Sequence, residues 1–243
     1  MGTQRRVAKI GRFSRPFNTA MCNRYHPTRA DIVRSQWNFG ALPTGDKTWR
    51  PGIGPFGTGP FIRIRDTEPE LVVGIWALIG DKDRKPNNAP RMTNNARSGR
   101  LEQKKTFAAP WARGQRCLIP AERFDYPNWE TGKNQWWTFR RADGEPWHLA
   151  GIWNAWTDPA TGEMFESYSM LTQNCDGHPL LSRFHKPEPD LPPDKQDKRS
   201  VIPLEVSDFR TWLTGTVDEA RALIQLLPAD RYDAQPDQPP KPA

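Results

Sequence analysis

The sequence predicts a single α+β domain of short strands in curved or barrel-like mixed sheets, with a few flanking helices. A chain of 243 residues suits one domain of roughly 200 residues with short tails. Its 25 prolines and 18 glycines imply frequent turns and few long helices. Between the turns lie short apolar runs, several with alternating polarity, which is the pattern of half-buried strands.

The expected elements follow in chain order. Strands are expected at 61–65, 70–78, 116–121, 136–140, 149–153 and 168–172, divided by Gly, Asp and Pro turns. Helices are expected at 29–37, 102–111 and 217–227. Residues 188–198 are rich in proline and charge and are expected to form a surface loop. The Pro-, Asp- and Gln-rich residues 228–243 are expected to be a disordered tail.

The first twenty residues differ from the rest in charge. They contain five basic residues, no acidic residue and no continuous apolar run, so they form neither a secretory signal nor a membrane span. Such a leader suits a targeting segment, a propeptide, or upstream sequence read from too early a start codon. Without it the formal net charge falls well below +7. Nucleic-acid binding by the remaining chain would therefore depend on a local basic patch.

Cys22 follows Met21 directly, at the end of this leader. If Met21 is removed, Cys22 carries a free α-amine, which titrates near neutrality, beside a thiol that is strongly nucleophilic when ionised. An aldehyde that meets both groups forms an imine and then closes to a thiazolidine ring. The alternative is an internal cysteine that serves as a small buried hydrophobe before a strand.

The other cysteines and the histidines exclude some classes of site. Three widely spaced cysteines argue against a disulfide framework and for a reducing, cytoplasmic location. Neither Cys-x-x-Cys nor His-x-x-x-His occurs, so we expect no metal and no cofactor. Cys117 and Cys175 lie in apolar or turn settings and are expected to be structural.

Several short motifs, in this order, resemble the SOS response-associated peptidase (SRAP) family of abasic-site processing proteins. They are MCNRY at 21–25, WALI at 76–79, NNARS at 94–98, RCLIPA at 116–121, GHP at 177–179, RFHKP at 183–187 and KRSVIPL at 198–204. Each motif is weak alone, but their order and spacing make the combination specific over about 21–215. The resemblance implies a leader at 1–21 and one SRAP-like domain at 22–227.

The resemblance also implies a function in the DNA damage response. The mature protein would begin at Cys22, bind single-stranded DNA and capture the aldehyde of an abasic site as a thiazolidine. It would remove its own leader as a cysteine peptidase and have lyase-like activity on the DNA. Asn95 would hold the cysteine and the sugar, and His185 would act as general acid/base, because imidazole titrates near neutral pH. We expect a monomer that is nucleoid-associated when bound to DNA and does not bind membranes.

One position departs from the family pattern. The family places a catalytic Glu where this chain has Tyr126. Asp125 is adjacent and Glu122 lies four residues earlier, so both are candidates to replace it. Neighbours in a strand face opposite sides, so Asp125 could substitute only if a bulge at Pro127 or a register slip re-aims it. The residues leave open which carboxylate acts, and whether peptidase and crosslink-reversal activities are retained.

Aromatic and basic residues supply the expected DNA contacts. Trp76, with Trp37 and Trp49, is expected to stack on unpaired bases. Phosphate contacts are expected from Arg24, Arg97, Arg183 and Arg199. Two other functions fit the same residues. One is an N-terminal-nucleophile amidohydrolase acting on a small amide through Cys22, and the other is a non-enzymatic single-strand-binding module in which Cys22 is incidental.

Overall fold

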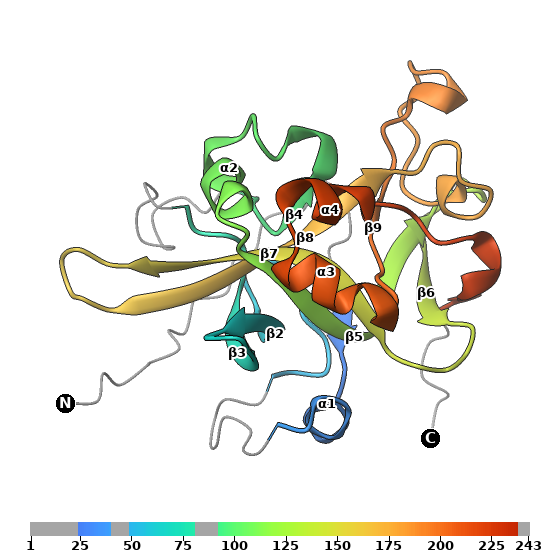
Figure 1. Cartoon of the computed structure of the whole chain (residues 1–243). Coiled ribbons are helices and arrows are strands. Elements are labelled where there is room, and N and C mark those ends of the chain that lie inside the picture. Colours follow the sequence, from blue (N-terminus) through green and yellow to red (C-terminus); the bar gives the residue numbers. More distant parts are fainter. Residues whose placement is uncertain (1–23, 40–48, 81–91, 238–243) are drawn as a thin grey trace.

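The computed structural model describes residues 24–39, 49–80 and 92–237 (Figure 1). Cys22 and the leader lie outside the described residues. The strands are β1 Tyr25–Pro27, β2 Thr58–Arg65, β3 Glu68–Trp76, β4 Asn95–Arg97, β5 Arg116–Asn128, β6 Gln135–Arg141, β7 Trp147–Thr157, β8 Met164–Asn174, β9 Arg199–Val201 and β10 Tyr232–Pro236. The α-helices are α1 Ala30–Trp37, α2 Lys105–Ala112, α3 Phe209–Thr214 and α4 Val217–Ala222. Short 3-10 turns are η1 Ser98–Arg100, η2 Leu181–Arg183, η3 Pro193–Lys195, η4 Val206–Asp208 and η5 Ala229–Arg231.

Five strands close into a barrel. β2 pairs with β3 and β5, β3 with β8, β8 with β7, and β7 with β5. All of these pairs are antiparallel except β3 with β8. Closure removes the free sheet edges that would otherwise invite pairing with another chain. The predicted barrel-like α+β fold is therefore confirmed.

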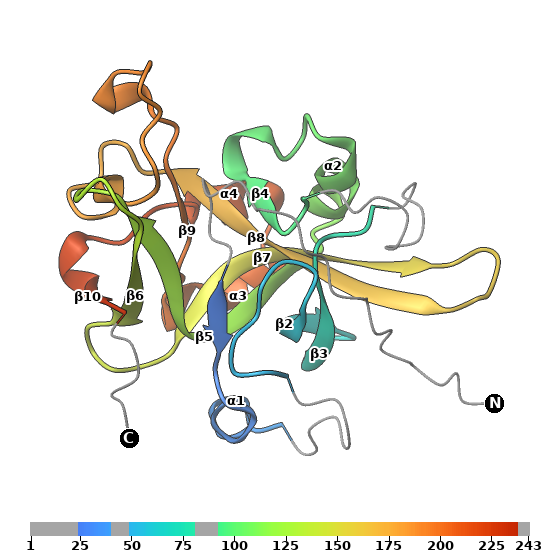
Figure 2. The ribbon, with the colours of Figure 1, turned by 180° about the vertical axis from the view of Figure 1, so that it is seen from behind.

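The remaining strands extend the barrel through β5 and β8. The first half of β5 pairs with β7, and its second half turns away to pair with β6, which in turn pairs with β10. β1 lies alongside β5 (Figure 2), while β4 and β9 pair with β8. Helix α3 packs on β5 on the face turned to the viewer in Figure 1. No helix in the described ranges is long and apolar enough to cross a membrane.

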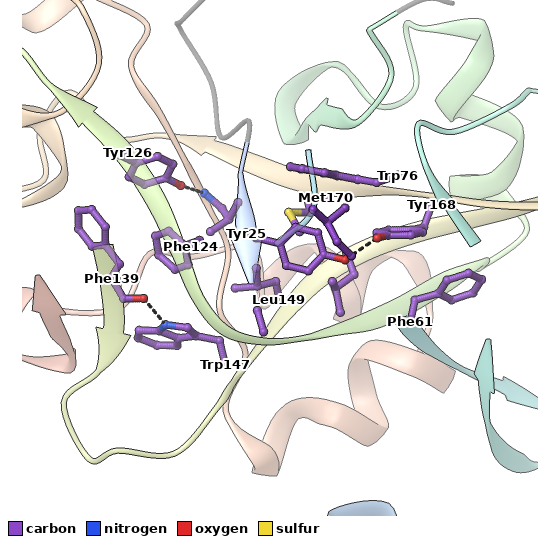
Figure 3. Packing of buried hydrophobic residues seen from close by; sticks show 14 of the residues in the cluster. Tyr25, Phe61, Trp76, Phe124, Tyr126, Phe139, Trp147, Leu149, Tyr168 and Met170 are labelled. Atoms are coloured by element: carbon purple, nitrogen blue, oxygen red, sulfur yellow. Dashed lines mark hydrogen bonds between the residues drawn. The ribbon is translucent and has the colours of Figure 1, made fainter. Parts of the chain in front are cut away.

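A core of aromatic rings fills the space between β5, β6, β7 and β8 (Figure 3). The Phe124 and Phe139 rings stack with centroids 5.2 Å apart, and the Tyr25 and Trp76 rings meet edge to face at 5.0 Å. Such pairs contribute about 0.5–1.5 kcal/mol beyond their buried area. Gly59 lets the backbone of β2 come close to the Tyr25 side chain, since a Cβ at this position would lie 2.3 Å from the Tyr25 hydroxyl.

The C-terminal segment differs from the sequence prediction. Residues 228–237 are not a disordered tail, because β10 pairs with β6 from Tyr232↔Arg141 to Pro236↔Trp137. Tyr232 is buried, with its ring 5.3 Å from that of Trp147. The helix expected at 217–227 ends at Ala222. It begins with a capping box between Thr216 and Glu219.

Candidate functional site

The chain that follows Cys22 is fixed to strand β5. The Asp125 N–H donates to the Arg24 carbonyl at 3.1 Å, and Tyr25 lies opposite Phe124 in the β1–β5 pair. β1 is antiparallel to β5. The N-terminal end of β1, at Arg24 and Tyr25, therefore lies on the side of Phe124 that leads along β5 towards Pro127.

Asp125 holds this first strand in place. Its carboxylate is almost fully buried (1% exposed) and accepts hydrogen bonds from Arg24 Nε at 2.5 Å, His26 Nε2 at 3.0 Å and Thr138 Oγ1 at 2.8 Å. Burial raises the pKa of Asp125, but the hydrogen bonds from His26 and Thr138 and the charge of Arg24 outweigh it. The net pKa lies below its ordinary value, so the carboxylate stays ionised.

His185 is also hydrogen-bonded to strand β5, at Pro127, which lies two residues beyond Asp125. Its backbone N–H donates to the Pro127 carbonyl at 2.7 Å, and its side chain is buried. Its φ of 67° is left-handed, an uncommon conformation for a residue other than glycine. Nε2 lies 2.9 Å from the Arg199 carbonyl. Because a carbonyl only accepts, Nε2 carries the hydrogen, and Nδ1 is the nitrogen that can take up a proton.

Tyr126 faces His185, with the two rings 4.7 Å apart. The Tyr126 hydroxyl accepts from the Val201 N–H at 2.9 Å and lies 3.1 Å from Ser200 Oγ. The residue at the position of the expected Glu is therefore a hydrogen-bonded phenol packed against the histidine.

Neither candidate carboxylate reaches His185. The β5–β6 register runs without a bulge from Phe124↔Phe139 to Asn128↔Gln135, so Asp125 points to the face opposite Tyr126. The bulge or register slip that Asp125 would need in order to replace the Glu is therefore absent from this stretch of β5. Glu122 bonds to Arg140 Nη1 at 2.8 Å, about 13 Å along the strand from Tyr126. Its pKa is lowered, chiefly by that hydrogen bond.

Asn95 opens strand β4 opposite Met170 of β8, and its side chain is buried. The preceding Asn94 has no exposed surface, and its carbonyl accepts from Trp76 Nε1 at 2.8 Å. Trp76 is itself fully buried and packs on Tyr25. The prediction that Trp76 stacks on bases is therefore wrong, because its ring offers no face to solvent.

Each of the four arginines expected to bind phosphate holds a carboxylate. Arg24 bonds to Asp125 and, at 2.9 Å, to Asp237. Arg183 bonds to Glu130 through Nε at 2.8 Å and Nη2 at 2.9 Å. The hydrogen bond from Arg183 lowers the pKa of Glu130 to about 2. Arg97 and Arg199 share a single partner, Asp197.

Sequence reasoning missed the aromatic residues of the β5–β6 hairpin. Three half-buried tryptophans carry a cation over their rings: Arg24 over Trp136 at 5.0 Å, Arg183 over Trp137 at 5.8 Å and Lys186 over Trp129 at 5.2 Å. The sequence contained one signal for these residues. Trp136 and Trp137 are adjacent, and adjacent residues in a strand must face opposite sides of the sheet. Across the described part of the chain, no three His, Cys, Asp or Glu side chains are grouped to hold a metal ion.

Comparison with known proteins adds to this geometry. The family model described as "SOS response associated peptidase (SRAP)" matches residues 21–236. Two curated relatives are named abasic site processing protein HMCES. The one from Rattus norvegicus is 27% identical over 74% of this chain and 55% of its own length, and the one from Pongo abelii is 24% identical over 51% and 43%. The chain thus spans about half the length of these relatives.

Solved structures with the same fold support the comparison. A crystal structure of a protein from Bordetella bronchiseptica superposes with a TM-score of 0.76 and 31% identity, covering 89% of this chain and all of that one. A second, from Bacteroides thetaiotaomicron, has a TM-score of 0.72 and 20% identity, covering 89% of this chain and 92% of that one. The second likeness concerns the fold alone.

Proposed function

The chain belongs to the SOS response-associated peptidase family, and on that premise we propose that it binds single-stranded DNA and captures abasic sites covalently through Cys22. The main support is that strand β5 binds both the start of the described chain, at Arg24, and His185 at neighbouring positions. The backbone of Arg24, two residues after Cys22, binds β5 at Asp125, and His185 binds it at Pro127. These anchor points are about 7 Å apart along a strand.

The proposed reaction needs a free N-terminal amine and a thiol on one residue. The Cys22 amine adds to the aldehyde carbon of the ring-opened sugar, and the carbonyl oxygen leaves as water to give an imine. The Cys22 sulfur then adds to the imine carbon, and the thiol proton passes to the nitrogen, which closes the thiazolidine. His185 Nδ1 is the proposed proton carrier for sugar opening and for loss of water.

The amine becomes available when residues 1–21 are absent. We infer that the chain removes this leader itself. The thiol of Cys22 attacks the Met21 carbonyl and the Met21–Cys22 C–N bond breaks, which frees the amine and leaves a thioester. Water then hydrolyses the thioester, restoring the thiol and releasing residues 1–21 with a carboxyl end. Tyr126 cannot supply a carboxylate for that step. Asp125 faces away from Tyr126 and His185, and Glu122 is paired with Arg140 about 13 Å along the strand from Tyr126. Initiation at Met21 followed by ordinary methionine removal gives the same N-terminus. The binding partner is single-stranded DNA, and the protein acts as a cytoplasmic monomer.

A crosslinking assay tests the proposal. Protein from the full reading frame is mixed with a single-stranded oligonucleotide that contains one abasic site, heated in detergent and separated by electrophoresis. We expect a heat-stable adduct that Cys22→Ser abolishes while leaving reversible binding to intact oligonucleotide unchanged. An equally stable adduct with Cys22→Ser would overturn the proposal in favour of a lysine Schiff base.

Cys175→Ser is the matched control. The Cys175 thiol is buried, and burial raises its pKa to about 12, so it is not a nucleophile at neutral pH. Adduct yield should match that of the wild type.

The two alternative functions predict other results. An amidohydrolase would turn over small amides, and a non-enzymatic binding module would bind the oligonucleotide reversibly without forming an adduct.

His185→Ala tests the proton carrier. The adduct should form more slowly by roughly 10²–10⁴ in rate but still accumulate, because the sugar also opens spontaneously. An unchanged rate would remove His185 from the mechanism.

A further inference from the structure

One carboxylate bridges two of the arginines expected to bind phosphate. Asp197 Oδ2 accepts from Arg97 Nη1 at 2.7 Å, and Asp197 Oδ1 accepts from Arg199 Nη2 at 2.5 Å. Each oxygen thus serves one guanidinium. The Asp197 and Arg97 side chains are about two-fifths exposed, whereas Arg199 is mostly buried. The bridge therefore lies at the surface, where a ligand can reach it.

The two arginines flank one end of strand β8. Arg97 of β4 lies opposite Thr172, and Arg199 of β9 lies opposite Asn174. The Arg199 carbonyl is the group 2.9 Å from His185 Nε2. Arg199 thus connects the pair to the proposed proton carrier, since its carbonyl binds His185 and its guanidinium binds Asp197.

A fixed loop delivers Asp197 to this place. The backbone N–H groups of Asp197 and Lys198 both donate to the Asp176 carboxylate at 2.9 Å. Asp197 has a left-handed φ of 52°, which Asp tolerates better than most residues. The Gln196 side chain donates to the carbonyls of Leu191 at 2.6 Å and Pro192 at 3.2 Å. Four anchoring hydrogen bonds thus keep this end of the 188–198 loop folded.

The arginine pair also retains donor capacity. Arg199 Nε is buried and has no hydrogen-bond partner among the described residues. A buried donor without an acceptor is unfavourable, because it has lost its hydrogen bonds to water. An anion larger than a carboxylate, with more acceptor oxygens, would satisfy this donor as well as the two that Asp197 now occupies.

We propose that Asp197 is an internal competitor for a DNA phosphodiester on the Arg97–Arg199 pair. The carboxylate and the phosphodiester each carry one negative charge shared by two oxygens that suit guanidinium donors, and the phosphodiester has two ester oxygens as further acceptors. A single strand therefore binds by exchange: its phosphate takes the two arginines, and Asp197 swings to solvent. Asp197 thereby lowers the affinity for intact single strands. This inference rests on the proposed function.

A binding experiment with a matched control tests it. Fluorescence anisotropy is measured with an intact single-stranded oligonucleotide, so that no covalent reaction contributes, over about 50–200 mM salt. We expect Asp197→Asn to bind roughly tenfold more tightly than wild type at low salt, since the two charge-assisted bonds that Asp197 makes with Arg97 and Arg199 no longer have to be broken.

Asp190→Asn is the control, because it makes the same charge change at an exposed acid of the same loop that none of the described ion pairs includes. We expect it to change affinity less than twofold. In an Arg97→Gln background the gain from Asp197→Asn should shrink, as a double-mutant cycle reports for coupled groups.

The outcomes separate the two proposals. If the wild type binds but Asp197→Asn gains no more than Asp190→Asn, the competitor role is wrong. Weaker binding by Asp197→Asn would mean that Asp197 orients the arginines for DNA, which also overturns it. If neither the wild type nor Asp197→Asn binds single strands at all, the proposed function itself fails, and this inference with it.

Discussion

Replacing Asp125 with alanine should destabilise the fold strongly, because this carboxylate ties β1 to β5 and β6. The change leaves Arg24 Nε, His26 Nε2 and Thr138 Oγ1 without their acceptor. A hydrogen bond to a charged group contributes about 1.5–3 kcal/mol, and breaking a buried charged pair costs about 3–5 kcal/mol. Arg24 is 39% exposed, so solvent screens its share. We expect a loss of about 3 kcal/mol at pH 7 from these terms.

The same carboxylate should make the stability of the fold depend on pH. The pKa of Asp125 is lower folded than unfolded, so its contribution is present above the unfolded carboxyl pKa. It is lost as the pH falls through the lowered folded value. The difference in free energy of unfolding between the wild type and Asp125→Ala should therefore be largest at neutral pH and become smaller in acid.

Urea unfolding of both proteins from pH 7 downwards measures these differences. Glu122→Ala is the matched control: its carboxylate pairs with Arg140 at a 45% exposed surface position, and such pairs contribute about 0–1 kcal/mol. The reasoning is refuted if Asp125→Ala loses no more stability than Glu122→Ala at pH 7. A difference that does not shrink in acid would show that packing, not charge, is responsible.

Three further predictions concern buried or site residues. Burial lowers the pKa of His148 to about 4, so the unfolded state takes up the proton first, and stability should fall by roughly 3 kcal/mol between pH 6.5 and 4. Urea unfolding should show this slope in the wild type and not in His148→Gln. Tyr126→Phe leaves the Val201 N–H without its acceptor, and we expect about 1–3 kcal/mol of destabilisation in urea unfolding with little change in adduct yield. Asn95→Ala should slow adduct formation about tenfold or more if Asn95 positions the sugar, as quenched time courses will measure.

Local pattern was sufficient to predict most strands. The alternation in 61–65 and 136–140 lies within β2 and β6, and the apolar run at 116–121 forms the first half of β5. Side-chain period is a property of a few neighbouring residues, so it can be read without tertiary knowledge. β10 was missed because its polar residues gain their order from pairing with β6, a partner about ninety residues away.

Candidate site residues could be chosen from the sequence, but their arrangement could not be predicted from it. His185 and Asn95 were found as short motifs, and the structure places both in buried positions. The burial of Trp76 was missed, because a lone tryptophan gives no sign of which face it takes. The direction of Asp125 depends on the unbroken register of β5 with β6. Asp197 reaches Arg97, a hundred residues away, only because the loop folds back.

The central claim is that the Cys22 amine and thiol together capture the abasic aldehyde. It is tested most directly by the intact mass of the adduct between the purified protein and an abasic oligonucleotide, followed by peptide mapping. We predict the mass of a chain that begins at Cys22 plus the DNA, less one water, with the DNA attached to the N-terminal peptide. An adduct that retains residues 1–21, or one mapped to a lysine, would contradict the account.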